Sequence, residues 1–78
     1  MLDETKLRLV MAQVLGIQPH MIDDHASTDT IVAWTSLRHM NLILALEEAF
    51  SVQIPDEDAA NITSWALVRV VMSELVQA

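Results

Sequence analysis

The chain has 78 residues, a hydrophobic fraction of 53%, no cysteine and a net charge of −7. This length allows one domain over residues 1–78, and the missing cysteines exclude a disulfide scaffold, a cysteine nucleophile and a thiolate metal site. The negative charge argues against nucleic acid and anionic membranes as partners, because basic residues bind both, and it favours a partner with a basic surface.

The composition and the first residues narrow the class further. One glycine and two prolines in a chain rich in Leu, Val, Ala and Met predict helices. The start, MLDETK, lacks the apolar segment of a signal peptide, and no apolar run is long enough to span a bilayer. We therefore expect a free-standing cytoplasmic protein without a membrane span.

The first predicted helix covers residues 3–15, where apolar residues recur with helical spacing: Leu7, Val10, Met11 and Val14. Gly16 then stands where a C-terminal glycine cap belongs. Residues 17–35 are expected to form a long connection, and loops of this length in compact domains are usually functional. Four apolar residues are expected to anchor this connection on the core: Ile17, Ile22, Ile31 and Val32.

A second helix is predicted over residues 36–50, a short one over 56–61 after Pro55, and a last one over 64–76 with Thr63 as its N-cap. The last helix would bury one stripe: Trp65, Val68, Met72 and Leu75. Three long helices and a short one predict an all-α fold, a small antiparallel four-helix bundle with a long loop between helices 1 and 2.

The second predicted helix is apolar on two opposite sides when its residues are placed at about 100° each. One side gathers the residues expected in the core: Leu42, Ile43, Leu46, Ala49 and Phe50. The opposite side gathers Leu37, Met40, Asn41, Leu44, Glu47 and Glu48. Because a bundle covers one face of such a helix, the second face is predicted to bind a partner with a basic rim. The alternative is that the long loop packs over it.

Two hydroxyl side chains, Thr35 and Ser36, stand at the start of this helix, and either can cap it. If Thr35 is the cap, Ser36 becomes the first helical residue and its hydroxyl faces outward. A phosphate ester there would meet unsatisfied backbone N–H groups at the positive end of the helix dipole.

The segment TSLRHMNLILALEEAFSVQIPDED resembles the acyl and peptidyl carrier proteins, and the resemblance covers essentially the whole chain. The matching motifs are Ser36-Leu37, Leu46-Glu47-Glu48, Ile54-Pro55-Asp56-Glu57-Asp58 and Ile62-Thr63. The resemblance implies that Ser36 carries 4′-phosphopantetheine, which a phosphopantetheinyl transferase takes from coenzyme A. The thiol of this arm would hold an acyl or aminoacyl group as a thioester, and the chain itself would have no catalytic residues.

The resemblance also implies two further sets of residues. Acyl-loading and acyl-transfer enzymes of fatty acid, polyketide or related biosynthesis would use basic patches to bind the second helix at Thr35, Leu37, Arg38, Met40, Leu44, Glu47 and Glu48. The interior would shelter an acyl chain among Leu42, Leu46, Phe50, Ile54, Ile62 and Val68.

The chain departs from the family pattern around the serine. Thr35 replaces the usual Asp, Ala33-Trp34 precedes it where Gly-Trp or Gly-Ala/Val is usual, and Arg38 replaces a commonly acidic residue. Thr35 can still cap the helix, but it lacks the carboxylate that a transferase with positive groups would contact, so slower modification is expected. The alternative is an unmodified carrier-like adaptor domain that binds proteins through the same helix.

Other polar groups indicate less. His20, Asp23, Asp24 and His25 could bind zinc, but their spacing is nonspecific and we expect solvated loop residues. Residues 56–58 are acidic without the glycine of a calcium loop and are expected to start a helix. His39 lies one turn from Ser36, yet the sequence offers no orienting acid or oxyanion hole, so a serine hydrolase is the weakest alternative. No metal site is predicted.

Overall fold

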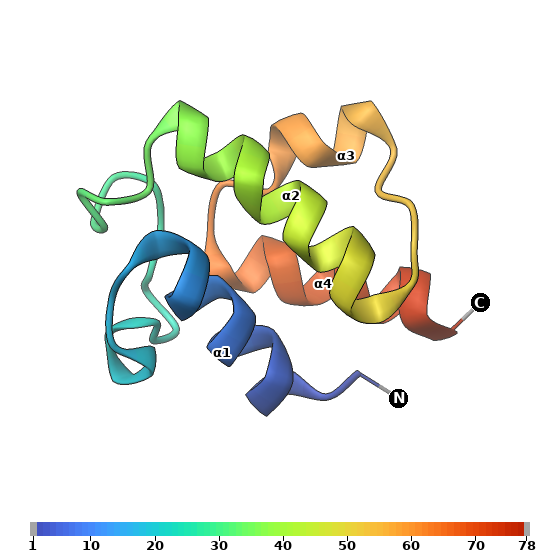
Figure 1. Ribbon diagram of the computed structural model, residues 1–78, viewed down its shortest axis with the longest axis horizontal. Coiled ribbons are helices and arrows are strands. Elements are labelled where there is room, and N and C mark those ends of the chain that lie inside the picture. Colours follow the sequence, from blue (N-terminus) through green and yellow to red (C-terminus); the bar gives the residue numbers. More distant parts are fainter. Residues whose placement is uncertain (1, 78) are drawn as a thin grey trace.

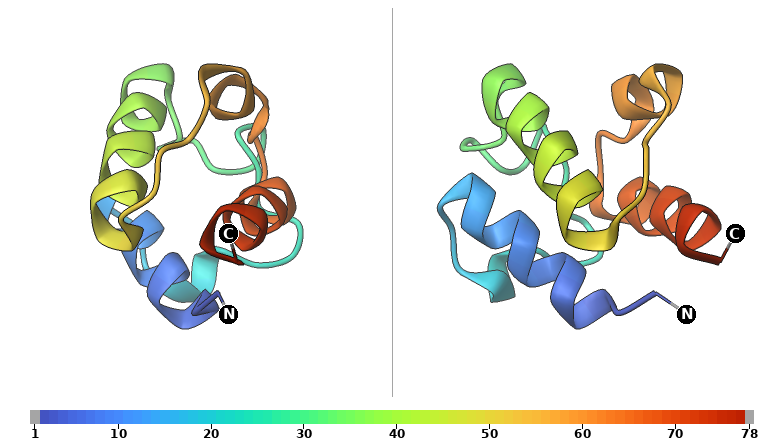
Figure 2. Two further views of the ribbon diagram at one scale, coloured as in Figure 1. Left: turned by 90° about the vertical axis from the view of Figure 1, so that its right-hand side faces the viewer. Right: turned by 45° about the vertical axis from the view of Figure 1, so that its right-hand side comes forward.

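In a computed structural model that describes residues 2–77, the chain folds into four α-helices (Figure 1). Helix α1 covers Glu4–Leu15, α2 covers Ser36–Phe50, α3 covers Asp56–Asn61 and α4 covers Trp65–Gln77. A 3₁₀ turn at Pro19–Met21 lies in the connection between α1 and α2. The four helices surround one apolar core (Figure 2), which confirms the predicted all-α fold with three long helices and a short one.

Helix α1 ends at Gly16, as the sequence predicts. Gly16 adopts a left-handed conformation with φ 68°, and its N–H donates to the carbonyl of Ala12. A Cβ at this position would lie 3.1 Å from a guanidinium nitrogen of Arg38. The left-handed backbone conformation therefore favours glycine, and a side chain here would also crowd the guanidinium of Arg38.

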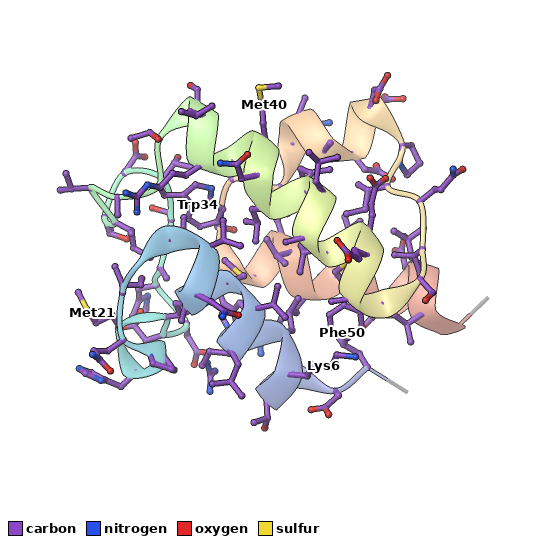
Figure 3. All side chains as sticks on the ribbon, viewed as in Figure 1. Lys6, Met21, Trp34, Met40 and Phe50 are labelled. Atoms are coloured by element: carbon purple, nitrogen blue, oxygen red, sulfur yellow. The ribbon has the colours of Figure 1, made fainter. Side chains whose placement is uncertain are left out.

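Helices α1 and α2 run antiparallel, and each provides a cation for the C-terminal end of the other. Lys6 Nζ donates to the carbonyl of Ala49 over 2.9 Å and lies 4.8 Å from the centroid of the Phe50 ring (Figure 3). At the opposite end of the pair, the guanidinium of Arg38 donates to the carbonyl of Leu15. The last carbonyls of a helix lack intrahelical partners and carry partial negative charge, so both contacts stabilise the pair.

The core contains the apolar stripes that the helical spacing predicts. In α1 and α4 the centres of these stripes are fully buried: Leu7, Met11, Trp65, Val68 and Met72. Val10, Val14 and Leu75 are half-buried at the margin of the core. Each large aliphatic side chain that is fully buried contributes about 1.5–3 kcal/mol.

The long connection between α1 and α2 is anchored by Ile22 and Ile31, which are buried, and by Ile17, which is half-buried. The predicted anchoring role of Val32 is wrong, because its side chain is 94% exposed. The N–H of Trp34 donates to the carbonyl of Ile31, so Val32 occupies the corner of a turn and points outward.

Helix α4 begins one residue later than the sequence predicts. Ser64 is its N-cap, since its hydroxyl accepts the N–H of Leu67 over 3.2 Å. The predicted cap, Thr63, is wrong because this residue belongs to the preceding connection. Its carbonyl accepts the N–H of Thr28 over 3.0 Å, in a short antiparallel pairing between the long loop and the segment that leads into α4.

Candidate functional site

Ser36 is the first residue of α2, and it is exposed. Thr35 precedes it with an extended backbone and caps the helix. The hydroxyl of Thr35 accepts the N–H of Arg38 over 3.3 Å, and its carbonyl accepts the N–H of His39 over 2.8 Å. The prediction that threonine preserves the cap in place of aspartate is therefore confirmed.

The surroundings of the Ser36 hydroxyl suit an attached phosphodiester. The backbone N–H groups of Ser36 and Leu37 precede the first intrahelical bond, and they lie at the positive end of a 15-residue helix. No acidic residue stands in the first turn of α2 to repel a phosphate. An ester on this oxygen would keep its charge in solvent and beside N–H donors, so the residues present fit a phosphopantetheine arm.

The outer face of α2 is apolar and uncovered. Leu37 is 70% exposed, Met40 66% and Leu44 64%. Met40 points away from the body of the molecule (Figure 3). The prediction of two apolar faces is confirmed, and the alternative in which the long loop covers the outer face is wrong.

The charged residues of this face differ in exposure and in their hydrogen bonds. Glu48 is exposed, whereas Glu47 is half-buried and its Oε2 accepts the N–H of Ile54 over 2.8 Å. The guanidinium of Arg38 donates a hydrogen bond to the carbonyl of Leu15 at the end of α1. Glu47 and Arg38 therefore hold the fold together as well as bordering the outer face, which the sequence did not predict.

The residues expected to shelter an acyl chain lie in the core. Five of them are buried: Leu42, Leu46, Ile54, Ile62 and Val68. Phe50 is half-buried at the end of α2, beneath Lys6. The structure thus brings this set together as packed core side chains.

His39 forms contacts that the sequence did not reveal. Its Nδ1 accepts the indole N–H of Trp34 over 3.0 Å, and its Nε2 lies 2.6 Å from the carbonyl oxygen of Ala59. Both ring nitrogens are therefore engaged away from Ser36, which removes the base that a serine hydrolase would need. The spacing of Trp34 and His39 is a weak local signal, but Ala59 lies in another helix, and only the fold brings it close.

A groove runs between α2 and α3 from the N-terminal end of α2, where Ser36 lies. Its first part has a volume of about 440 Å³ and is lined by Thr28, Trp34, Thr35, Ser36, His39, Met40, Ala60 and Thr63. Its second part, about 360 Å³, is lined by His39, Met40, Ile43, Leu44, Asp56, Ala59 and Ala60. The two parts share three residues and form one largely apolar surface, which we call the α2–α3 groove; most of its polar lining lies beside Ser36.

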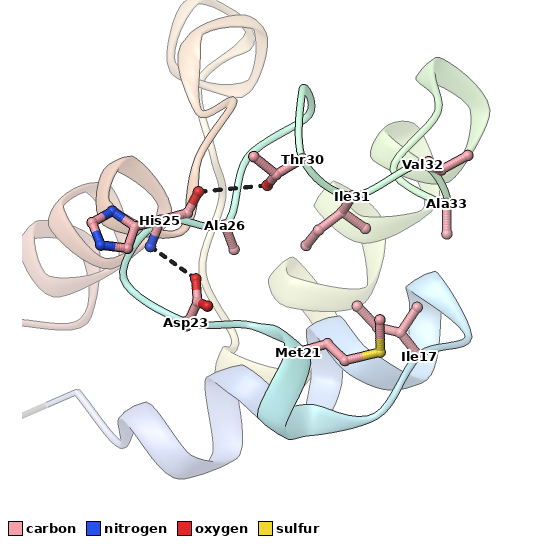
Figure 4. A pocket seen from close by; sticks show the side chains of 9 residues that line it. All are labelled: Ile17, Met21, Asp23, His25, Ala26, Thr30, Ile31, Val32 and Ala33. Carbon is pink, nitrogen blue, oxygen red and sulfur yellow. Dashed lines mark hydrogen bonds between the residues drawn. The ribbon is translucent and has the colours of Figure 1, made fainter.

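A separate hollow of about 630 Å³ lies in the long loop (Figure 4), where the carboxylate of Asp23 accepts the N–H of His25. The four residues considered for zinc, namely His20, Asp23, Asp24 and His25, are all exposed. Within residues 2–77, no three His, Asp or Glu side chains gather as a metal site would require. None of the helices in this range combines the length and apolar character needed to cross a membrane.

Residues 5–66 match the family model described as the phosphopantetheine attachment site. The matched range covers α1 from its second residue, α2, α3 and the first two residues of α4, and it includes Ser36 with its cap. Domains of this family carry covalently attached 4′-phosphopantetheine and are carriers without catalytic activity. The chain belongs to the phosphopantetheine-binding carrier family, to which the acyl and peptidyl carrier proteins that its sequence resembles also belong.

Proposed function

We propose that this single domain is an acyl carrier protein whose arm is attached to Ser36. It carries acyl or aminoacyl intermediates as thioesters and delivers them to enzymes of fatty acid, polyketide or related biosynthesis in the cytoplasm. The observation that carries the proposal is the exposed hydroxyl of Ser36 at the first residue of α2, in a chain of the phosphopantetheine-binding family. The chain presents this hydroxyl, and a phosphopantetheinyl transferase supplies the chemistry of attachment.

The outer face of α2 is proposed to bind the transferase and the acyl-handling enzymes. Its exposed apolar residues, Leu37, Met40 and Leu44, would fill an apolar depression in the partner. Acidic residues lie toward the far part of this face from Ser36: Glu48 stands in the last turn of α2, and Asp56 of α3 lines the groove with Leu44. We therefore expect the basic residues of the partner to meet the face near Glu48 and Asp56, while Thr35, Arg38 and Glu47 form its border.

An acyl chain on the arm is proposed to be sheltered between α2 and α3, which has no buried residue of its own. The buried set behind this opening contains Leu42, Leu46, Phe50, Ile54, Ile62 and Val68. Because these side chains are packed against one another, sheltering a chain would require α3 to move away from α2. The apolar part of the α2–α3 groove lies along that path.

Incubation with coenzyme A, Mg²⁺ and a broad-specificity phosphopantetheinyl transferase tests the attachment. Intact-mass spectrometry should show the gain of one phosphopantetheine, and peptide mapping should place it on Ser36. The variant Ser36→Ala should gain nothing. No gain by the wild-type chain, under conditions that modify an ordinary carrier, would reject the proposal and favour the unmodified adaptor.

The threonine before the serine allows a sharper test of recognition. Thr35→Asp restores the carboxylate of the family pattern and should raise kcat/KM for modification about ten- to a hundredfold, as expected for one charge-assisted contact. Thr35→Asn is the matched control, because asparagine also caps a helix but adds no charge. Equal rates for the two variants would show that charge at this position is not what the transferase recognises.

A further inference from the structure

His39 joins three segments that meet beside Ser36. Its ring lies between the indole of Trp34, in the loop before α2, and the carbonyl of Ala59 in α3. The rings of Trp34 and His39 are stacked, with centroids 6.1 Å apart and planes inclined by 26°. Helix α3 has six residues and none of them is buried, so its position depends on the buried Ile54 and Ile62 that flank it and on contacts of this kind.

The two partners of His39 determine where its proton lies. An indole N–H can only donate and a carbonyl oxygen can only accept, so Nδ1 is the bare acceptor and Nε2 carries the proton. The contacts therefore require a neutral imidazole in the Nε2–H tautomer. A second proton on Nδ1 would bring two N–H groups face to face and break the bond to Trp34.

We propose that His39 is a positioning residue for the attachment serine, which in its neutral Nε2–H form holds the Trp34–Ser36 segment and α3 around the α2–α3 groove. The proposal rests on the proposed function of Ser36. Trp34 is 4% exposed and stands two residues before Ser36, with the cap Thr35 between them. Fixing the indole fixes the backbone that enters the cap, and hence the direction in which Ser36 presents its hydroxyl.

The α2–α3 groove depends on the same side chain. His39 lines both of its parts, and its Nε2–H bond to Ala59 holds the α3 wall against α2. Loss of this bond would let the wall move. His39 therefore sets both the orientation of the attachment point and the space beside it.

The groups beside His39 come from several elements of the fold. Asp56, from α3, is the acidic residue that lines the groove with His39, while Glu57 and Asp58 line neither part. Arg38, its neighbour on α2, is engaged with the carbonyl of Leu15. The loop side contributes Trp34 and the hydroxyls of Thr28 and Thr35, and Thr63 comes from the segment before α4.

Nuclear magnetic resonance of the unmodified protein tests the contacts directly. The ¹⁵N shifts of His39 should report the Nε2–H tautomer. His39→Leu removes both bonds at similar volume and should speed exchange of the Trp34 indole N–H and the Arg38 amide about tenfold, as one lost hydrogen bond implies. The Arg38 amide is the informative probe, because it donates to the cap Thr35. Unchanged exchange of this amide would overturn the proposal.

Modification kinetics test the consequence for Ser36. His39→Leu should lower kcat/KM about three- to tenfold, in proportion to the fraction of chains with the segment in place. His39→Gln keeps an amide donor and acceptor, so it should recover most of the rate. A rate for His39→Gln as low as that of His39→Leu would overturn the proposal, because restoring a donor and an acceptor at this position would then have no effect.

Separate measurements can reject the attachment at Ser36 and the positioning role of His39. A wild-type chain that gains no mass rejects the attachment at Ser36, while the exchange measurements need no transferase and still decide whether His39 holds the segment. A chain modified equally fast with histidine or leucine at position 39 supports the attachment and overturns the positioning role. If His39→Leu does not fold, Trp34→Phe removes the same donor from the other side, and it should speed exchange of the Arg38 amide similarly.

Discussion

Helix α2 is held differently on its two sides. Toward α1 it packs through fully buried side chains, and two basic residues, Lys6 and Arg38, close the ends of the pair. Toward α3 the described hydrogen bonds are those of His39 to Ala59 and of Glu47 to Ile54, just before α3, and α3 has no buried residue of its own.

Helices α1 and α2 therefore form a firmly packed pair, which we call the firm pair, whereas α3 is held against α2 by few contacts. Ser36 is the first residue of α2 and so belongs to the firm pair. The groove beside it is bounded on its far side by α3, the element with the least burial, and regions of that kind open most readily. In the proposed carrier role, the α1 side of α2 would hold the attachment point, and the α3 side would open to make space for the cargo.

The largest expected effect is on the core side of α1. Leu7→Ala removes a side chain that is 0% exposed and should lower the free energy of unfolding by about 2–5 kcal/mol, measured by urea denaturation. Leu9→Ala, on the same helix but 52% exposed, should stay within about 0.5 kcal/mol of wild type. Similar losses in the two variants would contradict the assignment of α1 to the firm pair.

Gly16 provides the next largest effect. Gly16→Ala forces a side chain into a left-handed conformation and toward Arg38, so stability should fall by about 1–2 kcal/mol. Gly16→Asn should cost less, because asparagine tolerates this conformation better. Adding Arg38→Ala to Gly16→Ala separates the two causes: the part due to crowding should disappear, and the part due to the backbone should remain.

The two cations that cap α1 and α2 should differ in strength. Arg38→Gln removes a part-buried bond and should cost about 1–2 kcal/mol. Lys6→Gln acts at an exposed position and should cost about 0.3–1 kcal/mol. Thermal unfolding at low and high salt distinguishes them, since salt should weaken the exposed contact more. A larger loss of stability for Lys6→Gln than for Arg38→Gln would contradict this prediction.

The smallest effect on global stability is expected in α3. Ala60→Gly lowers helix propensity by about 1 kcal/mol at an exposed position. If α3 opens independently, amide exchange within it should rise about fivefold, while the global free energy of unfolding changes by less than about 0.5 kcal/mol. A global loss equal to the full propensity cost would show that α3 unfolds only with the rest of the domain.

Local signals in the sequence were sufficient to place the helices and to put Ser36 at the start of α2. Gly16 and Pro55 mark real boundaries, and Thr35 caps α2 although it replaces aspartate. Two local predictions failed where a neighbouring segment decided the outcome. Val32 points outward from a turn, and pairing with Thr28 keeps Thr63 out of α4.

Contacts between distant residues could not be predicted in this way. Arg38 meets Leu15 and His39 meets Ala59 only because the helices pack as they do, and no spacing along the chain specifies either contact. The exposure of Ser36 and the apolar outer face followed from helical geometry alone. The role of His39 needed the neighbouring helix and the loop before it.

The pairing of the long loop with the segment before α4 changes the entropy of the connection. The N–H of Thr28 binds the carbonyl of Thr63, and the N–H of Trp65 binds the carbonyl of Ala26. These bonds fix the loop at Ala26 and Thr28, so they divide it into two shorter loops, one on each side of the fixed residues. Short loops have less conformational freedom than long ones. The segment that leads into Ser36 is therefore restrained by contacts with residues 63–65, which lie far from it in the sequence.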